Sequence, residues 1–111
     1  MPGPSIPTVT VTDLAADAHL LDVREADEWA AGHAPDAQHV PMSQLTARLS
    51  EVPSDREVAV VCRSGHRSAR VVEFLRHQGW GNVHNLDGGM QDWAAAGRPM
   101  VAESDGPPRV L

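Results

Sequence analysis

One stretch near the middle of the chain constrains the fold most: an apolar run, a short loop and an amphipathic pattern follow one another directly. The apolar run covers residues 58–61 and ends at Cys62, the only cysteine among 111 residues. After a loop at 63–67, apolar positions recur with a period near 3.6 until Gly79. The run predicts a buried, parallel strand, and the periodicity predicts a helix that follows it.

This succession gives the thiol an unusual setting. A loop that turns directly into a helix points free backbone N–H groups at one place, and the helix N-terminus adds roughly half a positive charge. Such a place binds anions, and Arg63 and Arg67 flank the thiol of Cys62 that lies there. We therefore predict that Cys62 has a lowered pKa and that solvent reaches it. A lone cysteine after a strand can instead be a small buried apolar residue, but the arginines, Gly65 and the helix start favour a reactive thiolate.

The loop also resembles a known active site. Residues 62–68, CRSGHRS, resemble the active-site loop of rhodanese-type sulfurtransferases. Three more segments resemble motifs of this family and stand in the family's order: LLDVRE at 20–25, GHAPDAQHVP at 32–41 and LDGGMQDWAAAGRP at 86–99. The resemblance covers residues 9–101, and Asp36 departs from it, because the family usually has glycine there.

Strand and helix patterns alternate along the chain. We expect strands at 9–11, 19–23, 37–40, 58–61 and 82–86, and helices at 14–16, 25–31, 43–49, 68–78 and 90–96. This alternation predicts an α/β fold with helices on both faces of a sheet. The resemblance implies a rhodanese-like open, mostly parallel central sheet of about five short strands. We predict one domain over residues 1–103 and a flexible tail at 104–111, where Pro, Gly and acidic residues gather.

Further side chains are expected near the thiol, because the ligand crevice of a parallel sheet lies at the carboxyl ends of its strands. Asp22 and Arg24 stand at the end of the strand expected at 19–23. They either shape and charge the crevice or have a structural role, as an ion pair that braces a loop or as a cap, and we favour the structural role. His33 and His39 have no partner at metal-ligand spacing, so we expect structural roles for both and no metal site.

The resemblance implies roles for the loop residues. Cys62 would be the nucleophile, and the substrate-binding loop would consist of Arg63, Ser64, Gly65, His66 and Arg67, supported by Ser68. The arginines would attract an anionic donor, and Gly65 would allow a positive φ. Ser64 would either hydrogen-bond the bound sulfur or only turn the loop. His66 is a further candidate for assisting the chemistry.

A stabilised thiolate supports sulfur transfer, phosphoryl transfer, or redox and sensing chemistry. Phosphatases that use cysteine follow C-x5-R, whereas here Arg67 comes one position early and Ser68 takes that place. The shorter loop suits a single sulfane sulfur better than a tetrahedral phosphate. The resemblance implies a sulfurtransferase that takes sulfur from an anionic donor such as thiosulfate, holds it as a Cys62 persulfide, and passes it to cyanide or a cellular thiol. The alternatives are a cysteine-dependent phosphatase or arsenate reductase, and a non-catalytic rhodanese-like binding module.

Composition limits the partners. The formal net charge of −6 argues against nucleic acid and anionic membranes, whereas four arginines and one acid between Cys62 and Trp80 suit a small anionic substrate. A single cysteine excludes an intrachain disulfide, so the acceptor for the persulfide sulfur must be an external thiol or protein. The sequence has no signal-peptide pattern and no apolar stretch of roughly 20 residues. We therefore expect a cytoplasmic protein that needs no cofactor.

Overall fold

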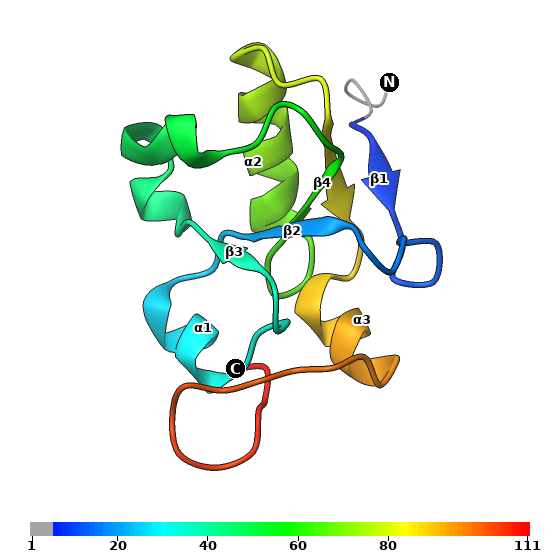
Figure 1. The fold of residues 1–111 in the computed structure, drawn as a ribbon, viewed down its shortest axis with the longest axis vertical. Coiled ribbons are helices and arrows are strands. Elements are labelled where there is room, and N and C mark those ends of the chain that lie inside the picture. Colours follow the sequence, from blue (N-terminus) through cyan, green and yellow to red (C-terminus); the bar gives the residue numbers. More distant parts are fainter. Residues whose placement is uncertain (1–5) are drawn as a thin grey trace.

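A five-stranded parallel sheet forms the centre of the computed structural model, which describes residues 6–111 (Figure 1). The strands are β1 (Thr8–Val9), β2 (His19–Asp22), β3 (Gln38–His39), β4 (Val58–Val61) and β5 (Val83–Leu86). Their order across the sheet is β1-β5-β4-β2-β3, and every neighbouring pair is parallel. The predicted α/β class with a five-stranded sheet is confirmed. The first five residues of the predicted domain lie outside the described residues.

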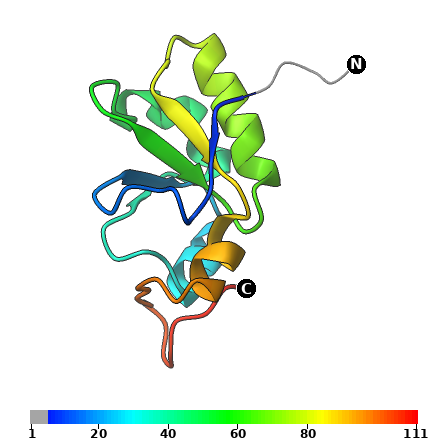
Figure 2. The same cartoon turned by 90° about the vertical axis from the view of Figure 1, so that its right-hand side faces the viewer.

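The central strand β4 is buried on both faces, as its unbroken apolar run predicts. Val58 and Val60 point into one core, which α2 (His66–His77) covers, while Ala59 and Val61 point into a second core with α3 (Gly89–Ala95). Both views place α3 and α1 (Ala26–Ala31) at the same end of the molecule, beside the loop that follows β4 (Figures 1 and 2). The carboxyl ends of the strands therefore meet two helices and one loop.

Two predicted helices are wrong. Residues 14–16 are irregular, with a bend at 14 and a turn at 16, because three helical positions are too few to offset the cost of nucleating a helix. The helix predicted at 43–49 is a pair of 3-10 segments, η1 (Met42–Gln44) and η2 (Thr46–Glu51). Arg48 leaves the helical region with φ −118° and ψ 21°, which interrupts the second segment. None of the helices in residues 6–111 is long and apolar enough to cross a bilayer.

The last residues follow the body of the molecule, and Figure 1 shows the C-terminus beside α1. The backbone N–H of Arg109 donates to the carbonyl of Ala31 at 2.9 Å, and Val110 packs against the second core. A Cβ on Gly32 would lie 2.4 Å from the Arg109 carbonyl, so only glycine fits at this approach. These contacts give the predicted tail a defined path, and its flexibility stays a prediction.

Candidate active site

The proposed nucleophile lies where two helices begin. Cys62 follows β4 directly, and the loop of residues 62–65 leads into α2 through Gly65, whose φ of 108° is the positive value expected of it. From the other side, the first N–H groups of α3 hold the same loop. Met90 N donates to the carbonyl of Cys62 at 2.8 Å, and Gln91 N donates to the carbonyl of Arg63 at 3.0 Å. The loop is therefore fixed by elements that are distant from it in the sequence.

The sulfur of Cys62 accepts hydrogen bonds from this loop. Gly65 N donates to Sγ at 3.1 Å, and the Ser68 hydroxyl lies 3.3 Å from Sγ. Burial raises the pKa of Cys62, but it is outweighed by the Ser68 hydroxyl, when that hydroxyl donates to the ionised sulfur, and by the N–H groups of Ser68, Gly65 and Ser64, so the pKa is lowered. The direction and the contribution of backbone N–H groups agree with the sequence analysis, and the Ser68 hydroxyl is a further cause.

The expectation that solvent reaches the sulfur is wrong for this structure. Cys62 is only 1% exposed, since its side chain points into the loop and is covered by the residues that hydrogen-bond it. The more exposed side chains of this region belong to residues 63, 64 and 66, which we call the mouth of the loop. Arg63 and His66 are exposed there, and Ser64 Oγ lies 3.1 Å from His66 Nδ1. The structure gives Arg63 no ion pair within residues 6–111.

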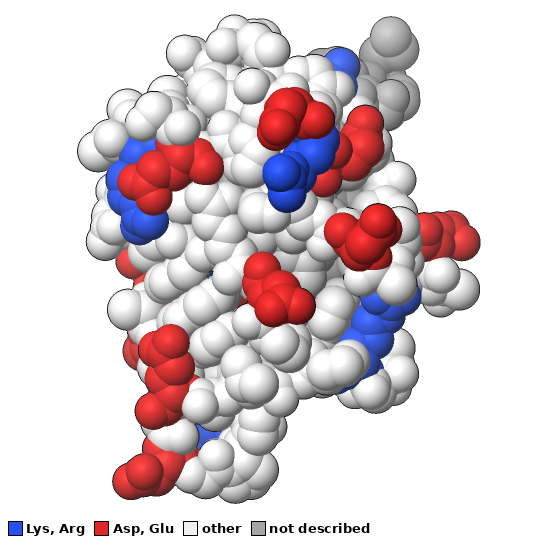
Figure 3. Space-filling view, viewed as in Figure 1, with Lys and Arg blue, Asp and Glu red and all other residues white. Residues whose placement is uncertain are grey.

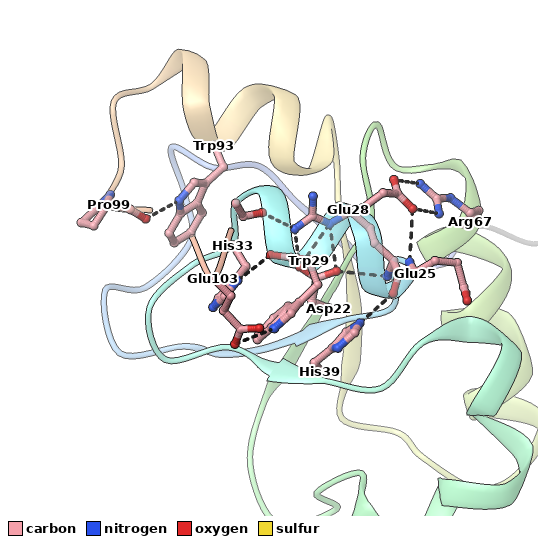
Figure 4. Close-up of polar contacts among 12 residues, drawn as sticks. Asp22, Glu25, Glu28, Trp29, His33, His39, Arg67, Trp93, Pro99 and Glu103 are labelled. Carbon is pink, nitrogen blue, oxygen red and sulfur yellow. Dashed lines mark hydrogen bonds and ion pairs between the residues drawn. The ribbon is translucent and has the colours of Figure 1, made fainter. Parts of the chain in front are cut away.

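Arg67, in contrast, is engaged by a residue that the sequence analysis missed. Its two terminal nitrogens donate to the two carboxylate oxygens of Glu28, both at 2.8 Å, and Figure 4 shows the pair face to face. The Glu28 side chain is 15% exposed and that of Arg67 36%. The hydrogen bond with Arg67 lowers the pKa of Glu28, against the effect of burial. The only local signal for Glu28 is its place in the first turn of α1, where its side chain also accepts from the N–H of Glu25.

A second missed residue lies behind the sulfur. Asn85 of β5 pairs with Val60 of β4, two residues before Cys62, and is 6% exposed. The Ser68 hydroxyl donates to Asn85 Oδ1 at 2.5 Å, and Asn85 Nδ2 donates to the Gly65 carbonyl at 3.2 Å. The signal that could have found it is an amide inside a largely buried strand, because such a group needs a polar partner.

Asp22 and Arg24 form the bracing ion pair that the sequence analysis favoured. Both side chains are fully buried, with Arg24 Nη2 2.8 Å from Asp22 Oδ2. Arg24 Nη2 also donates to the carbonyl of Gly32 at 2.7 Å, which fixes the end of α1. Arg24 Nη1 has no hydrogen-bond partner among the described residues. Because neither side chain is exposed, the pair acts on the site through the loops that it holds.

The two histidines have structural contacts, as expected. The Trp29 ring lies between them, stacked on His33 with centroids 3.5 Å apart and on His39 at 4.4 Å (Figure 4). A nitrogen of each imidazole also meets a backbone carbonyl, that of Trp29 for His33 and that of Arg24 for His39. This stack supports the loop that carries Arg24.

The surface agrees with the acidic composition. On the face seen in Figure 3, acidic side chains are spread widely and the arginines lie among them. This face therefore has no continuous basic surface of the kind that binds a nucleic-acid backbone.

Comparisons with known proteins agree with this geometry. The family model for the rhodanese-like domain matches residues 10–96. A protein of Allochromatium vinosum named sulfurtransferase is 46% identical over 86 residues, which are 78% of this chain and 80% of that protein.

Solved structures of rhodanese-like proteins are also similar to this chain. The crystal structure of a rhodanese-related protein from Thermoplasma volcanium has a TM-score of 0.80 at 34% identity, and the match covers 86% of this chain and 97% of that one. A thiosulfate sulfurtransferase from Pseudomonas aeruginosa has a TM-score of 0.77 at 27% identity, over 96% of this chain but 22% of that longer protein. The chain is a member of the rhodanese-like domain family.

Proposed function

We propose that this protein is a sulfurtransferase that carries sulfane sulfur from an anionic donor, such as thiosulfate, to an external acceptor as a persulfide on Cys62. The observation that carries the proposal is the setting of the only thiol. Its sulfur accepts from the Gly65 N–H at 3.1 Å at the start of α2, and its pKa is lowered by the loop. A relative named sulfurtransferase over most of both chains supports the same class.

In the first step, the Cys62 thiolate attacks the outer sulfur of thiosulfate. A bond forms between Sγ and that sulfur while the S–S bond of thiosulfate breaks, and sulfite leaves with the bonding electron pair. The exposed Arg63 at the loop mouth would attract the anionic donor and stabilise the departing sulfite. Loop N–H groups would stabilise the negative charge on the terminal sulfur of the persulfide.

In the second step, an external nucleophile attacks the terminal sulfur and Cys62 leaves as a thiolate. Cyanide would become thiocyanate, and a thiol would become a persulfide of its own. Since the chain contains one cysteine, no internal thiol can accept the sulfur. A free, functional thiol also favours a reducing compartment, so we propose the cytoplasm as the place of action.

A phosphatase is the weaker alternative. Phosphoryl transfer needs a guanidinium that clamps the phosphate oxygens, and the terminal nitrogens of Arg67 are already bound to Glu28. Ser68, which stands where C-x5-R loops have arginine, is buried against Asn85. These contacts favour a loop built around sulfur alone.

The test is thiocyanate release from thiosulfate and cyanide, with Cys62→Ser as the inactive variant. Incubation with thiosulfate alone should add one sulfur to the intact mass, and a reductant should remove it. Undiminished turnover by Cys62→Ser would overturn the mechanism. Absence of the adduct with every sulfane donor tried would favour the binding module, and cysteine-dependent hydrolysis of an aryl phosphate would favour the phosphatase.

A further inference from the structure

A buried chain of polar groups runs from the sulfur into the sheet and back to the loop. Ser68 Oγ lies 3.3 Å from Cys62 Sγ and 2.5 Å from Asn85 Oδ1. Asn85 Nδ2 then donates to the carbonyl of Gly65 at 3.2 Å. Ser68 is fully buried and Asn85 is 6% exposed, so water does not readily replace either hydrogen-bond partner in this series of polar groups.

The direction of these hydrogen bonds follows from the chemistry of the groups. The carbonyl of Gly65 can only accept, so the Asn85 atom that meets it is the NH2 group. The atom that faces Ser68 is therefore the amide oxygen, which also can only accept. Ser68 has a single hydroxyl proton, and in this arrangement that proton points at Asn85.

This direction matters for Cys62, because the lone pairs of Ser68 Oγ then face the sulfur. A neutral S–H can donate to them, whereas a thiolate would meet a second acceptor. To stabilise the thiolate, Ser68 has to turn its proton from Asn85 to Sγ. The turn leaves the amide oxygen of Asn85 buried without a donor from the described part of the chain, and an unpaired buried acceptor is unfavourable.

We propose that Asn85 is a positioning residue that sets the charge state of Cys62 by competing with it for the hydroxyl proton of Ser68. The Ser68 hydroxyl donates to Asn85 while the sulfur is a thiol, and donates to the sulfur instead when the sulfur ionises. Only the O–H bond of Ser68 turns, and the proton that Cys62 loses goes to water.

Under the proposed sulfur transfer, formation of the persulfide would allow the Ser68 hydroxyl to turn its proton back toward Asn85. The negative charge then lies on the terminal sulfur, and Sγ, bonded to carbon and sulfur, is neutral. Asn85 would thus favour the thiol and the persulfide over the free thiolate between them.

The pH profile of Cys62 alkylation by iodoacetamide, measured on the full chain, tests this role. Asn85→Leu frees the Ser68 proton for the sulfur, so the midpoint of the profile should move to lower pH. Below the midpoint of the unmodified protein, the rate should rise about threefold to tenfold, as expected when a thiolate gains one hydrogen bond. In a Ser68→Ala background, the same Asn85→Leu change should leave the midpoint in place.

An unchanged or raised midpoint in Asn85→Leu would overturn the proposal, as would an equal fall in the Ser68→Ala background. If Asn85→Leu does not fold, the nearly isosteric Asn85→Asp carries the test. Its carboxylate holds the Ser68 proton more strongly, so the midpoint should rise, and rise less in the Ser68→Ala background; equal rises would overturn the role of Ser68. Alkylation needs no sulfur donor, so failure of the proposed sulfur transfer would be seen separately, in the thiocyanate assay.

Discussion

Arg67 and Glu28, 39 residues apart in the sequence, meet through two parallel hydrogen bonds of 2.8 Å. The pair joins the first turn of α2, where the sulfur loop ends, to the first turn of α1. An arginine that the motif suggests as a free receptor for anions is thereby used to hold two helix starts together. At the mouth of the loop, Arg63 is the exposed arginine beside Cys62.

The Glu28–Arg67 pair should contribute a stability that depends on pH. The pKa of Glu28 is lowered from 4.5, so the contribution is present above that value and is lost as the pH falls through the lowered pKa. Glu28→Gln should reduce the free energy of unfolding by about 1 kcal/mol or less near neutral pH, because both side chains are partly exposed. Urea unfolding at several pH values measures this difference, which should shrink in acid. Glu73→Gln on α2 makes the same charge change as a control, and an equal effect there would argue against the pair.

Arg63→Ala should weaken the use of an anionic donor. Loss of one exposed charge at the loop mouth is expected to lower kcat/KM for thiosulfate about threefold to tenfold, mostly through KM, and to reduce its dependence on ionic strength. Steady-state rates at low and high salt provide the measurement. Arg70→Ala removes an exposed arginine of α2, seven residues further along the chain, and should have a smaller effect. Equal losses in both variants would show that only net charge matters.

Alkylation of Cys62 should begin at a lower pH than alkylation of a free thiol, and its rate should depend on the size of the reagent. Its lowered pKa predicts that alkylation by iodoacetamide sets in at lower pH than for a free thiol. Its 1% exposure predicts that a bulky maleimide reacts much more slowly than iodoacetamide, relative to a small thiol compound under the same conditions. In urea the two reagents should regain their ordinary ratio. A folded protein that already shows the ordinary ratio would mean that the sulfur is open.

Gly89→Ala should damage the site, and Gly97→Ala provides a matched control. Both glycines have positive φ, 54° and 73°, so both changes carry a backbone cost of roughly 1–2 kcal/mol. A Cβ at Gly89 would also lie 2.3 Å from the carbonyl of Cys62, whereas within residues 6–111 one at Gly97 meets no atom within 4 Å. We expect Gly97→Ala to keep sulfur transfer and Gly89→Ala to lose both activity and additional stability. Thermal unfolding and the thiocyanate assay together test this, and matching behaviour of the two variants would refute the proposed contact.

The central part of the fold could be predicted because its signals are local. The apolar run at 58–61 and the period of the following helix occupy adjacent residues, and both appear as β4 and α2. The 3-10 segments near Arg48 were harder to predict, since their residues suit a helix whereas the backbone angles of Arg48 are not helical. The short edge strands β1 and β3, of two residues each, end earlier than predicted because each has one neighbouring strand.

The candidate site likewise has features that the local sequence predicts and features that depend on distant residues. The order Cys62 to Ser68 indicated the proposed nucleophile and its loop, and the expected positive φ of Gly65 is present. Glu28 and Asn85, by contrast, reach the loop across 39 and 17 residues, and no local pattern contains such distances. The enclosure of Cys62 was missed for a related reason. A motif identifies which residue is reactive, whereas accessibility depends on the packing of every neighbour.

The hydrogen bonds from α3 to the loop that carries Cys62 affect when the thiol acquires its setting during folding. The carbonyls of Cys62 and Arg63 are fixed by N–H groups of Met90 and Gln91, so the setting of the sulfur is incomplete until the later part of the chain has docked. We expect a partly folded chain to carry a thiol of ordinary reactivity. The reactivity of the Cys62 sulfur should thus show whether the whole domain has folded.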